Sequence, residues 1–315
     1  MTQTTKTILS TYQIRKTAKQ KSAFRDYVQE IATQEGYAYH TEKGMFGAVN
    51  AIVGDPTTAK VVYTAHYDTC ARLPFPNFIT PKSIGIYLLY QVGISILFML
   101  LPAFLLSGLV GFICGVLQVP ELLAFALVEV TFAGVLVLLM VLLIAGPANK
   151  HTVNDNTSGV TVLFDLMCGM PKDLRQDVAF IFFDLEEAGL FGSAGYVSGH
   201  KKAMADKLLL NFDCVSDGEH IIFALSKKAV KYATMLEEAY PSDESVTSEV
   251  LTRGVFYPSD QMNFPCGVGV AALKANKKGK LLYMDKIHTS KDRVYREENI
   301  AFLVKGSIAL LEHWQ

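Results

Sequence analysis

Asp177–Gly195, DVAFIFFDLEEAGLFGSAG, is the stretch from which the fold of this chain can be worked out. It contains an apolar run, Val178 to Phe183, that ends in three carboxylates, Asp184, Glu186 and Glu187, followed by glycines. An apolar run of this length between charges and glycine predicts a strand that is buried on both faces of a sheet and opens into a loop at its carboxyl end. The carboxylates at that end need a partner that offsets their charge.

Glu186 and Glu187 cannot point the same way from an extended backbone, so a site that uses both gives them different tasks. One glutamate can bind a metal while its neighbour handles a proton. Two negative charges at a buried strand end repel each other and are costly to desolvate, and a divalent cation removes both problems. From this pair alone, an exposed acidic turn is the alternative.

The composition separates one unusual segment from an ordinary domain. Half of the 315 residues are hydrophobic and the net charge is −1, without a basic cluster, so we expect no nucleic-acid partner. The five cysteines show no CxxC spacing, which favours a reducing compartment. The N-terminus lacks the apolar core of a signal peptide, so we expect the first residues to stay in the cytoplasm.

The segment from Ile84 to Gly146 contains no Lys, Arg, His or Asp. It is long enough for two or three membrane spans of about 20 residues each. If residues before and after it build one site, the chain must return to the side it left, which requires an even number of spans. We therefore predict a transmembrane hairpin at 83–146 with spans at about 84–106 and 122–145, between two parts of one catalytic domain, 1–82 and 147–315. The alternative is a hydrophobic arm buried in an oligomer.

Flanking charges give the orientation of this hairpin. Arg72 and Lys82 precede it and Lys150 follows it, whereas the predicted loop between the spans has no positive charge. The positive-inside rule then places the catalytic part in the cytoplasm and the protein in the cell membrane.

The rest of the chain alternates strand-like and helix-like segments. We expect helices from about Ser10 to Gln34 and from about Glu297 to His313, and strands at Lys60–Ala65 and Lys207–Phe212. The alternation predicts an α/β fold, a mixed and largely parallel sheet sandwiched by helices, with its site at the carboxyl ends of the strands.

Five potential metal ligands occur where a strand ends or a helix begins. Two imidazoles and three carboxylates are enough for two divalent ions that share one bridging carboxylate. The five residues are His66, Asp155, Glu187, Asp213 and His288.

The order His-x-Asp, Asp-Asn-x-Ser-Gly, Glu-Glu, Asp, His-Thr resembles the di-zinc aminopeptidases of metallopeptidase family twenty-eight, relatives of glutamate carboxypeptidase and the transferrin receptor. The resemblance covers residues 1 to about 82 and 147 to 315. It implies that Asp155 bridges two Zn²⁺ ions, with His66 and Asp213 on one and Glu187 and His288 on the other.

The resemblance also implies catalytic roles. Glu186 would be the general base that takes a proton from the attacking water and passes it to the leaving amine, and Asp68 would orient His66. The peptide bond after the bridging Asp155 is often cis in this family. The family's Ser-Asp-His sequence near the substrate pocket is replaced here by Ser259-Asp260-Gln261.

The function that we predict is a membrane-anchored zinc aminopeptidase that acts on peptides. Candidate substrate-binding residues are Tyr257, Asp260 and His151. The alternatives are another amide hydrolase on the same metals, such as a carboxypeptidase or deacylase, and a catalytically silent membrane scaffold. Peptide and lipid bilayer are the expected partners, and the oligomeric state is left open.

Overall fold

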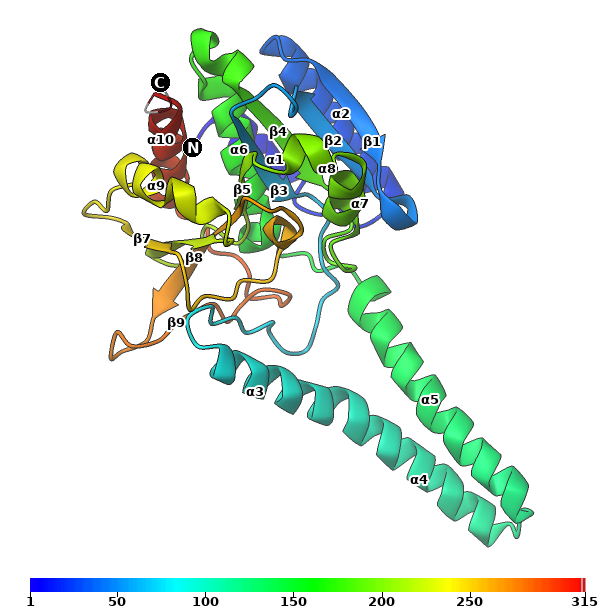
Figure 1. Cartoon of the computed structure of the whole chain (residues 1–315). Coiled ribbons are helices and arrows are strands. Elements are labelled where there is room, and N and C mark those ends of the chain that lie inside the picture. The colour runs from blue at the N-terminus through cyan, green and yellow to red at the C-terminus, as the bar shows by residue number, and fades with distance from the viewer. Residues whose placement is uncertain (313, 315) are drawn as a thin grey trace.

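The computed structural model describes residues 1–312 and 314, and its centre is one nine-stranded sheet (Figure 1). The order along the sheet is β1-β2-β4-β3-β5-β8-β6-β7, and β9 pairs with β8. The strands are β1 (Tyr39–Lys43), β2 (Val49–Gly54), β3 (Val61–His66), β4 (Val178–Phe183), β5 (Leu208–Phe212), β6 (His220–Leu225), β7 (Thr247–Leu251), β8 (Gly267–Ala275) and β9 (Leu282–Tyr283).

The centre of the sheet is parallel, as the buried apolar runs predict. β4, β3, β5 and β8 pair in parallel, and antiparallel pairs extend the sheet at β2 and β6. Every residue of β3, β4 and β5 is buried, because helices or loops cover both faces. The predicted fold class is confirmed, and β4 has the bounds expected from its sequence.

The two faces of the sheet are covered by different helices. A large core joins one face to α1 (Gln3–Thr11), α2 (Ala18–Gln34), α6 (Gly159–Gly169), α9 (Ala233–Ala239) and α10 (Glu297–Glu312). On the other face a smaller core involves α7 (Phe191–Gly199) and α8 (Lys201–Met204). The side chains alternate between these cores along β4, with Phe180 and Phe182 in the first and Ile181 and Phe183 in the second.

The N-terminal helical segment is divided, which the apolar spacing did not indicate. α2 begins with a capping box. The Thr17 side chain accepts from the backbone amide of Gln20, and the Gln20 side chain accepts from the backbone amide of Thr17. Before it the chain turns around the fully buried Arg15, whose guanidinium donates to the carbonyls of Tyr12 and Tyr67. The last helix is predicted to end at His313, and this residue lies outside the described residues.

Two long apolar helices project from the domain (Figure 1). The first is continuous over Ile84–Val116 and consists of α3 (Ile84–Ser95), a π-helical turn (Ile96–Leu100) and α4 (Leu101–Val116). The second is α5 (Glu121–Ala145). With 33 and 25 residues, both are long and apolar enough to cross a membrane.

The first apolar helix is longer than the first predicted span, which ends near residue 106. The helix continues to Val116 and only residues 117–120 connect it to α5. Pro102 lies in the first turn of α4, directly after the π-helical turn. The chain stays helical through Pro102 to Val116.

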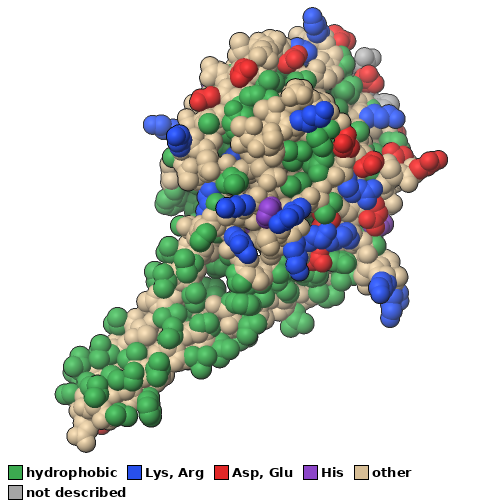
Figure 2. Space-filling view, turned by 180° about the vertical axis from the view of Figure 1, so that it is seen from behind, with side chains coloured by type: hydrophobic (Ala, Val, Ile, Leu, Met, Phe, Trp, Pro, Cys, Tyr) green, Lys and Arg blue, Asp and Glu red, His purple; other side chains and the backbone are tan. Residues whose placement is uncertain are grey.

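The two helices contact each other mainly in their outer halves. The rings of Phe104 on α4 and Phe132 on α5 lie 4.9 Å apart, and Gly111 lies close to Val128. Most large apolar side chains of the pair are exposed, and Figure 2 shows the hydrocarbon surface that they form.

Candidate metal centre

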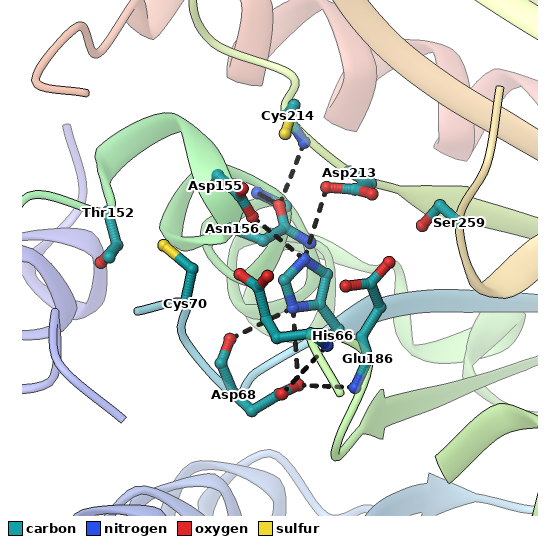
Figure 3. Close-up of polar contacts among 12 residues, drawn as sticks. His66, Asp68, Cys70, Thr152, Asp155, Asn156, Glu186, Asp213, Cys214 and Ser259 are labelled. Atoms are coloured by element: carbon teal, nitrogen blue, oxygen red, sulfur yellow. Dashed lines mark hydrogen bonds and ion pairs between the residues drawn. The ribbon is translucent and has the colours of Figure 1, made fainter. Parts of the chain in front are cut away.

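The predicted ligands converge at the carboxyl edge of the parallel strands, and Figure 3 shows His66, Asp155 and Asp213 together there. His66 is the last residue of β3, Glu187 follows β4 and Asp213 follows β5, and these strands are neighbours in the sheet. Asp155 comes from the segment before α6, and its peptide bond to Asn156 is cis, as the resemblance implied. His288 reaches the same edge from the loop after β9, with a φ angle of 64°.

One group of donors consists of His66, Asp155 and Asp213. His66 Nε2 lies 3.3 Å from Asp155 Oδ1 and 3.4 Å from Asp213 Oδ1. All three residues are buried, and their donor atoms lie within 4.8 Å of one another. This spacing suits three ligands of one ion.

A second group shares Asp155 with the first. His288 Nε2 lies 3.1 Å from Asp155 Oδ2 and 3.3 Å from Glu187 Oε2. Cys70 belongs to the same group, since its sulfur and the three other donor atoms lie within 4.8 Å of one another. Asp155 therefore offers one oxygen to each group, which is the arrangement of a bridging carboxylate.

The residues present fit divalent ions by their unbalanced charge and free donor atoms. Asp213 Oδ1 and Glu187 Oε1 are buried and have no hydrogen-bond partner in the part of the chain that is described. Burial alone lowers the pKa of His66, but Glu186, Asp155, Asp213 and Asp68 outweigh it and raise that pKa well above its usual value. The surrounding carboxylates thus strongly favour a positive charge next to them. A bound cation supplies that charge while the His66 imidazole stays neutral.

Asp68 holds both the imidazole and the glutamate loop. Its backbone carbonyl lies 3.1 Å from His66 Nδ1, and its carboxylate accepts from the amides of Glu186 at 3.0 Å and Glu187 at 3.2 Å. With Nδ1 directed at the backbone carbonyl of Asp68, His66 presents Nε2 to the donor group.

Glu186 is not in the two groups that share Asp155, but it forms a third group with His66 and Glu187, whose donor atoms lie within 4.8 Å of one another. It lines a cavity of about 290 Å³ together with Asp155, Asp213, Tyr257 and His288. Burial raises the pKa of Glu186 well above its usual value, and the neighbouring carboxylates act in the same direction. A carboxyl group with a raised pKa is suited to accept and return a proton near neutral pH.

The three candidate substrate residues lie in different surroundings. Tyr257 lines the 290 Å³ cavity, and its hydroxyl donates to the Asp213 carbonyl at 2.9 Å. Asp260 is buried, and neither of its carboxylate oxygens has a hydrogen-bond partner among the described residues. His151 is not among the residues that line the cavity, and its Nε2 lies 2.8 Å from the Arg293 guanidinium.

Two residues of the site were missed at the level of sequence. Cys70 lies two residues after Asp68 and four after His66, but its sequence context alone favours a core or wall thiol over a metal ligand. Asp292 accepts from the amides of Asn154 at 2.7 Å and Asp155 at 3.0 Å and so positions the bridging residue. The closeness of Cys70 to the His-x-Asp motif was the available signal, whereas Asp292 acts through backbone contacts that no motif indicates.

A donor set of this kind at the carboxyl edge of a mixed α/β sheet is typical of metal-dependent hydrolases. The comparison with known families is more specific, because the model of peptidase family M28 matches residues 142–308. This is more than half of the chain, and the chain belongs to peptidase family M28, as predicted. None of the curated proteins matches it.

Solved structures with this fold have different activities. The LapA aminopeptidase of Legionella pneumophila is 13% identical, with a TM-score of 0.55 over 98% of this chain and 69% of that chain. A Porphyromonas gingivalis glutaminyl cyclase is 15% identical, with a TM-score of 0.55 over 99% and 98%. A leucine aminopeptidase precursor of Bacteroides thetaiotaomicron is 12% identical, with a TM-score of 0.54 over 99% and 95%. At these identities the likeness concerns the fold.

Proposed function

We propose that this protein is a membrane-anchored, zinc-dependent aminopeptidase of family M28 that uses two metal ions. The observation that carries the proposal is the pair of donor groups that share Asp155, with Glu186 beside them in one cavity. His66 and Asp213 complete one ion site, and Glu187 and His288 the other. The mixture of imidazole, carboxylate and one nearby thiol favours zinc over magnesium or calcium.

The protein's own groups then have distinct tasks. When bound, the ions would polarise the scissile carbonyl and lower the pKa of a water molecule. Glu186 accepts the proton of the attacking water and passes it to the leaving amine, for which its raised pKa is suitable. Asp68 keeps Nε2 of His66 directed at the ion site. Tyr257, on the cavity wall, holds the Asp213 loop through its hydrogen bond to the Asp213 carbonyl.

The helix pair supports the membrane anchor. Both helices exceed the length needed for a hydrocarbon core of about 30 Å, at about 1.5 Å rise per residue. Their side chains are exposed hydrocarbon, and Figure 2 shows Lys and Arg side chains on the domain near the base of the pair. We propose that residues 83–146 form the transmembrane hairpin, with the catalytic domain, 1–82 and 147–315, in the cytoplasm.

Glutaminyl cyclase activity is the competing function that the solved structures raise. The aminopeptidase LapA and the Porphyromonas cyclase have the same TM-score against this chain, so the fold does not choose between them. The match to the model of peptidase family M28 supports hydrolysis.

The test combines metal analysis with a substrate panel. Full-length protein in detergent is analysed for zinc and assayed on aminoacyl reporters, their N-acetylated forms and a peptide with N-terminal glutamine. We expect close to two zinc ions per chain and release of free N-terminal residues. Cyclisation of the glutamine peptide without hydrolysis of the others would replace the aminopeptidase by a cyclase. Protein without bound metal would contradict the proposal and support a silent scaffold.

A further inference from the structure

A cavity of about 520 Å³ leads from the candidate metal centre into the space between the two apolar helices. Its inner end is formed by Glu187 and His288, and Asn77 lies at the same end. These three residues also line the 290 Å³ cavity over the site, so the two cavities meet there. We call the larger one the wedge.

The wedge is built by the loop 72–77 and the inner halves of the helices. The Leu73 amide donates to the His288 carbonyl at 2.8 Å, and the Asn77 amide donates to the Ile287 carbonyl at 3.3 Å. The ring of Phe75 lies 4.4 Å from that of Phe98, in the π-helical turn of the first helix. The same loop therefore connects the His288 loop to the helix pair.

The wall of the wedge changes character with distance from the site. Near the site the polar groups already have partners, since the Gln91 side chain donates to Asn77 at 3.2 Å and the Tyr90 hydroxyl donates to the Pro76 carbonyl at 2.6 Å. Further along the helices the lining is hydrocarbon apart from Ser95, and Arg72 lies in the loop that forms one wall. The hydrocarbon part is formed by Ile94, Phe98, Met99, Leu139, Leu142 and Leu143.

The volume and the apolar wall of the wedge together indicate which kind of molecule it binds. At about 30 Å³ for a water molecule, 520 Å³ corresponds to roughly seventeen water-sized groups, more than one amino-acid side chain contains. A peptide segment in the wedge would bring amide and carbonyl groups into a hydrocarbon wall, where each unpaired group is costly. A hydrocarbon chain has no such groups.

We infer that the wedge binds the hydrocarbon chain of a long-chain acyl amide whose scissile bond lies at the metal centre. The inference rests on the proposed amide hydrolysis at that site and extends it to a second acyl class. Water adds to the amide carbonyl, the carbon–nitrogen bond breaks, and the products are a long-chain carboxylic acid and a free amine. Because the wedge begins at Glu187 and His288, its entrance lies where a chain attached to the scissile carbonyl carbon would leave the metal centre. If the helices cross a membrane, such a substrate reaches the site from the bilayer.

The test measures how turnover depends on acyl chain length. Full-length protein in nanodiscs is assayed on N-acyl-alanines from acetyl to octanoyl, below their micelle concentrations, with aminoacyl reporters in parallel. We expect kcat/KM to rise by up to about fourfold per added methylene, the effect of burying one CH₂ group. Leu143→Trp, which places a bulkier side chain in the wedge, should flatten this rise, so that the longest and shortest acyl chains are turned over with similar kcat/KM. Leu138→Trp is the matched control, since Leu138 is exposed on the same helix and does not line the wedge.

A flat profile in the wild type, or the same rise in Leu143→Trp, would overturn the inference. An equal gain with peptides that carry an apolar N-terminal segment would also overturn it in favour of a peptide channel. Failure to hydrolyse any amide would instead reject the proposed function. A photoreactive palmitoyl amide then tests the wedge alone: adducts on Phe98 and Met99 that Leu143→Trp removes support it, and adducts confined to outward-facing side chains contradict it.

Discussion

The metal centre and the helix pair are opposite departures from an ordinary soluble protein. The metal centre places carboxylates and imidazoles in the interior, with buried oxygen atoms that lack partners among the described residues. The helix pair places large apolar side chains on the surface. Each arrangement is costly in water, one through desolvated charge and the other through exposed hydrocarbon.

The difference shows what each region requires from outside the chain. Positive charge would stabilise the first region, and an apolar solvent would stabilise the second. The two regions contact each other at the wedge, where Glu187 and His288 lie at one end and Leu139 and Leu143 along the wall. We therefore expect substitutions at the metal centre to leave membrane insertion unchanged, and substitutions on the helix pair to leave metal binding unchanged.

The largest effect should come from Glu186→Gln. Removing the proton acceptor while keeping the side-chain shape should lower kcat by about 10³-fold, within the range of general-base catalysis. Zinc content by elemental analysis and membrane partition by flotation should match the wild type, since Glu186 is not one of the residues around Asp155. Glu238→Gln, at a residue far from the site in sequence and outside every lining of the cavities described, serves as the control. Loss of zinc in Glu186→Gln would show that Glu186 is a ligand instead of a base.

The fold and the convergence of the five ligand candidates could be predicted from the sequence. Apolar runs such as Val178–Phe183 have the length of buried strands, and parallel strands bring the residues after them to one edge. His66, Glu187 and Asp213 follow three strands that are neighbours in the structure, whereas the shared role of Asp155 was implied by the family resemblance and not by local pattern.

The missed features depend on contacts that a local pattern does not contain. The break at Arg15 comes from carbonyls of Tyr12 and Tyr67, and the second of these belongs to a distant part of the chain. The first apolar helix continues through Pro102 because a π-helical turn precedes it. Cys70 became a candidate ligand only once His288 and Glu187 were placed beside it.

A charge on the lipid-facing side of the helix pair should have the next largest effect. We expect Leu138→Arg, at a side chain that is 56% exposed near the middle of α5, to destabilise membrane insertion by about 3 kcal/mol. The measurement is the fraction of protein in the membrane after expression, with Leu138→Ala as the control for lost volume. The zinc content of the fraction that does insert should be unchanged. Full insertion of Leu138→Arg would show that this face contacts protein or water and not lipid.

A smaller effect should follow from Asp68→Asn. The carboxylate accepts from the amides of Glu186 and Glu187 and faces His66 Nδ1, at 3.6 Å, so its loss should loosen the ligands without removing one. We expect zinc affinity and kcat/KM to fall by about 10- to 100-fold. Competition with a chelator measures the affinity, and saturation with zinc should restore part of the activity. Unchanged zinc affinity would show that the Asp68 carboxylate does not position the ligands, and that the backbone carbonyl, which Asn keeps, is enough to orient His66.

The smallest effect concerns the pH dependence of stability and Asp260. Burial raises the pKa of this carboxyl from 3.8 to about 7 in the metal-free protein, and His66 opposes the shift. The folded state therefore holds a proton that the unfolded state loses at lower pH. The stability that this proton contributes is complete below pH 3.8 and is lost as the pH rises through about 7. Asp260→Asn should remove this dependence, so the Tm of the metal-free wild type should fall between pH 5 and 8 by a few degrees relative to the variant, on the order of 1–2 kcal/mol. Thermal unfolding after chelation, with Asp206→Asn at an exposed position as control, measures the difference. Parallel pH profiles for wild type and Asp260→Asn would mean that Asp260 is already ionised in the folded protein. The metal centre would then tolerate one more buried negative charge in the absence of a cation, against the contrast drawn with the helix pair.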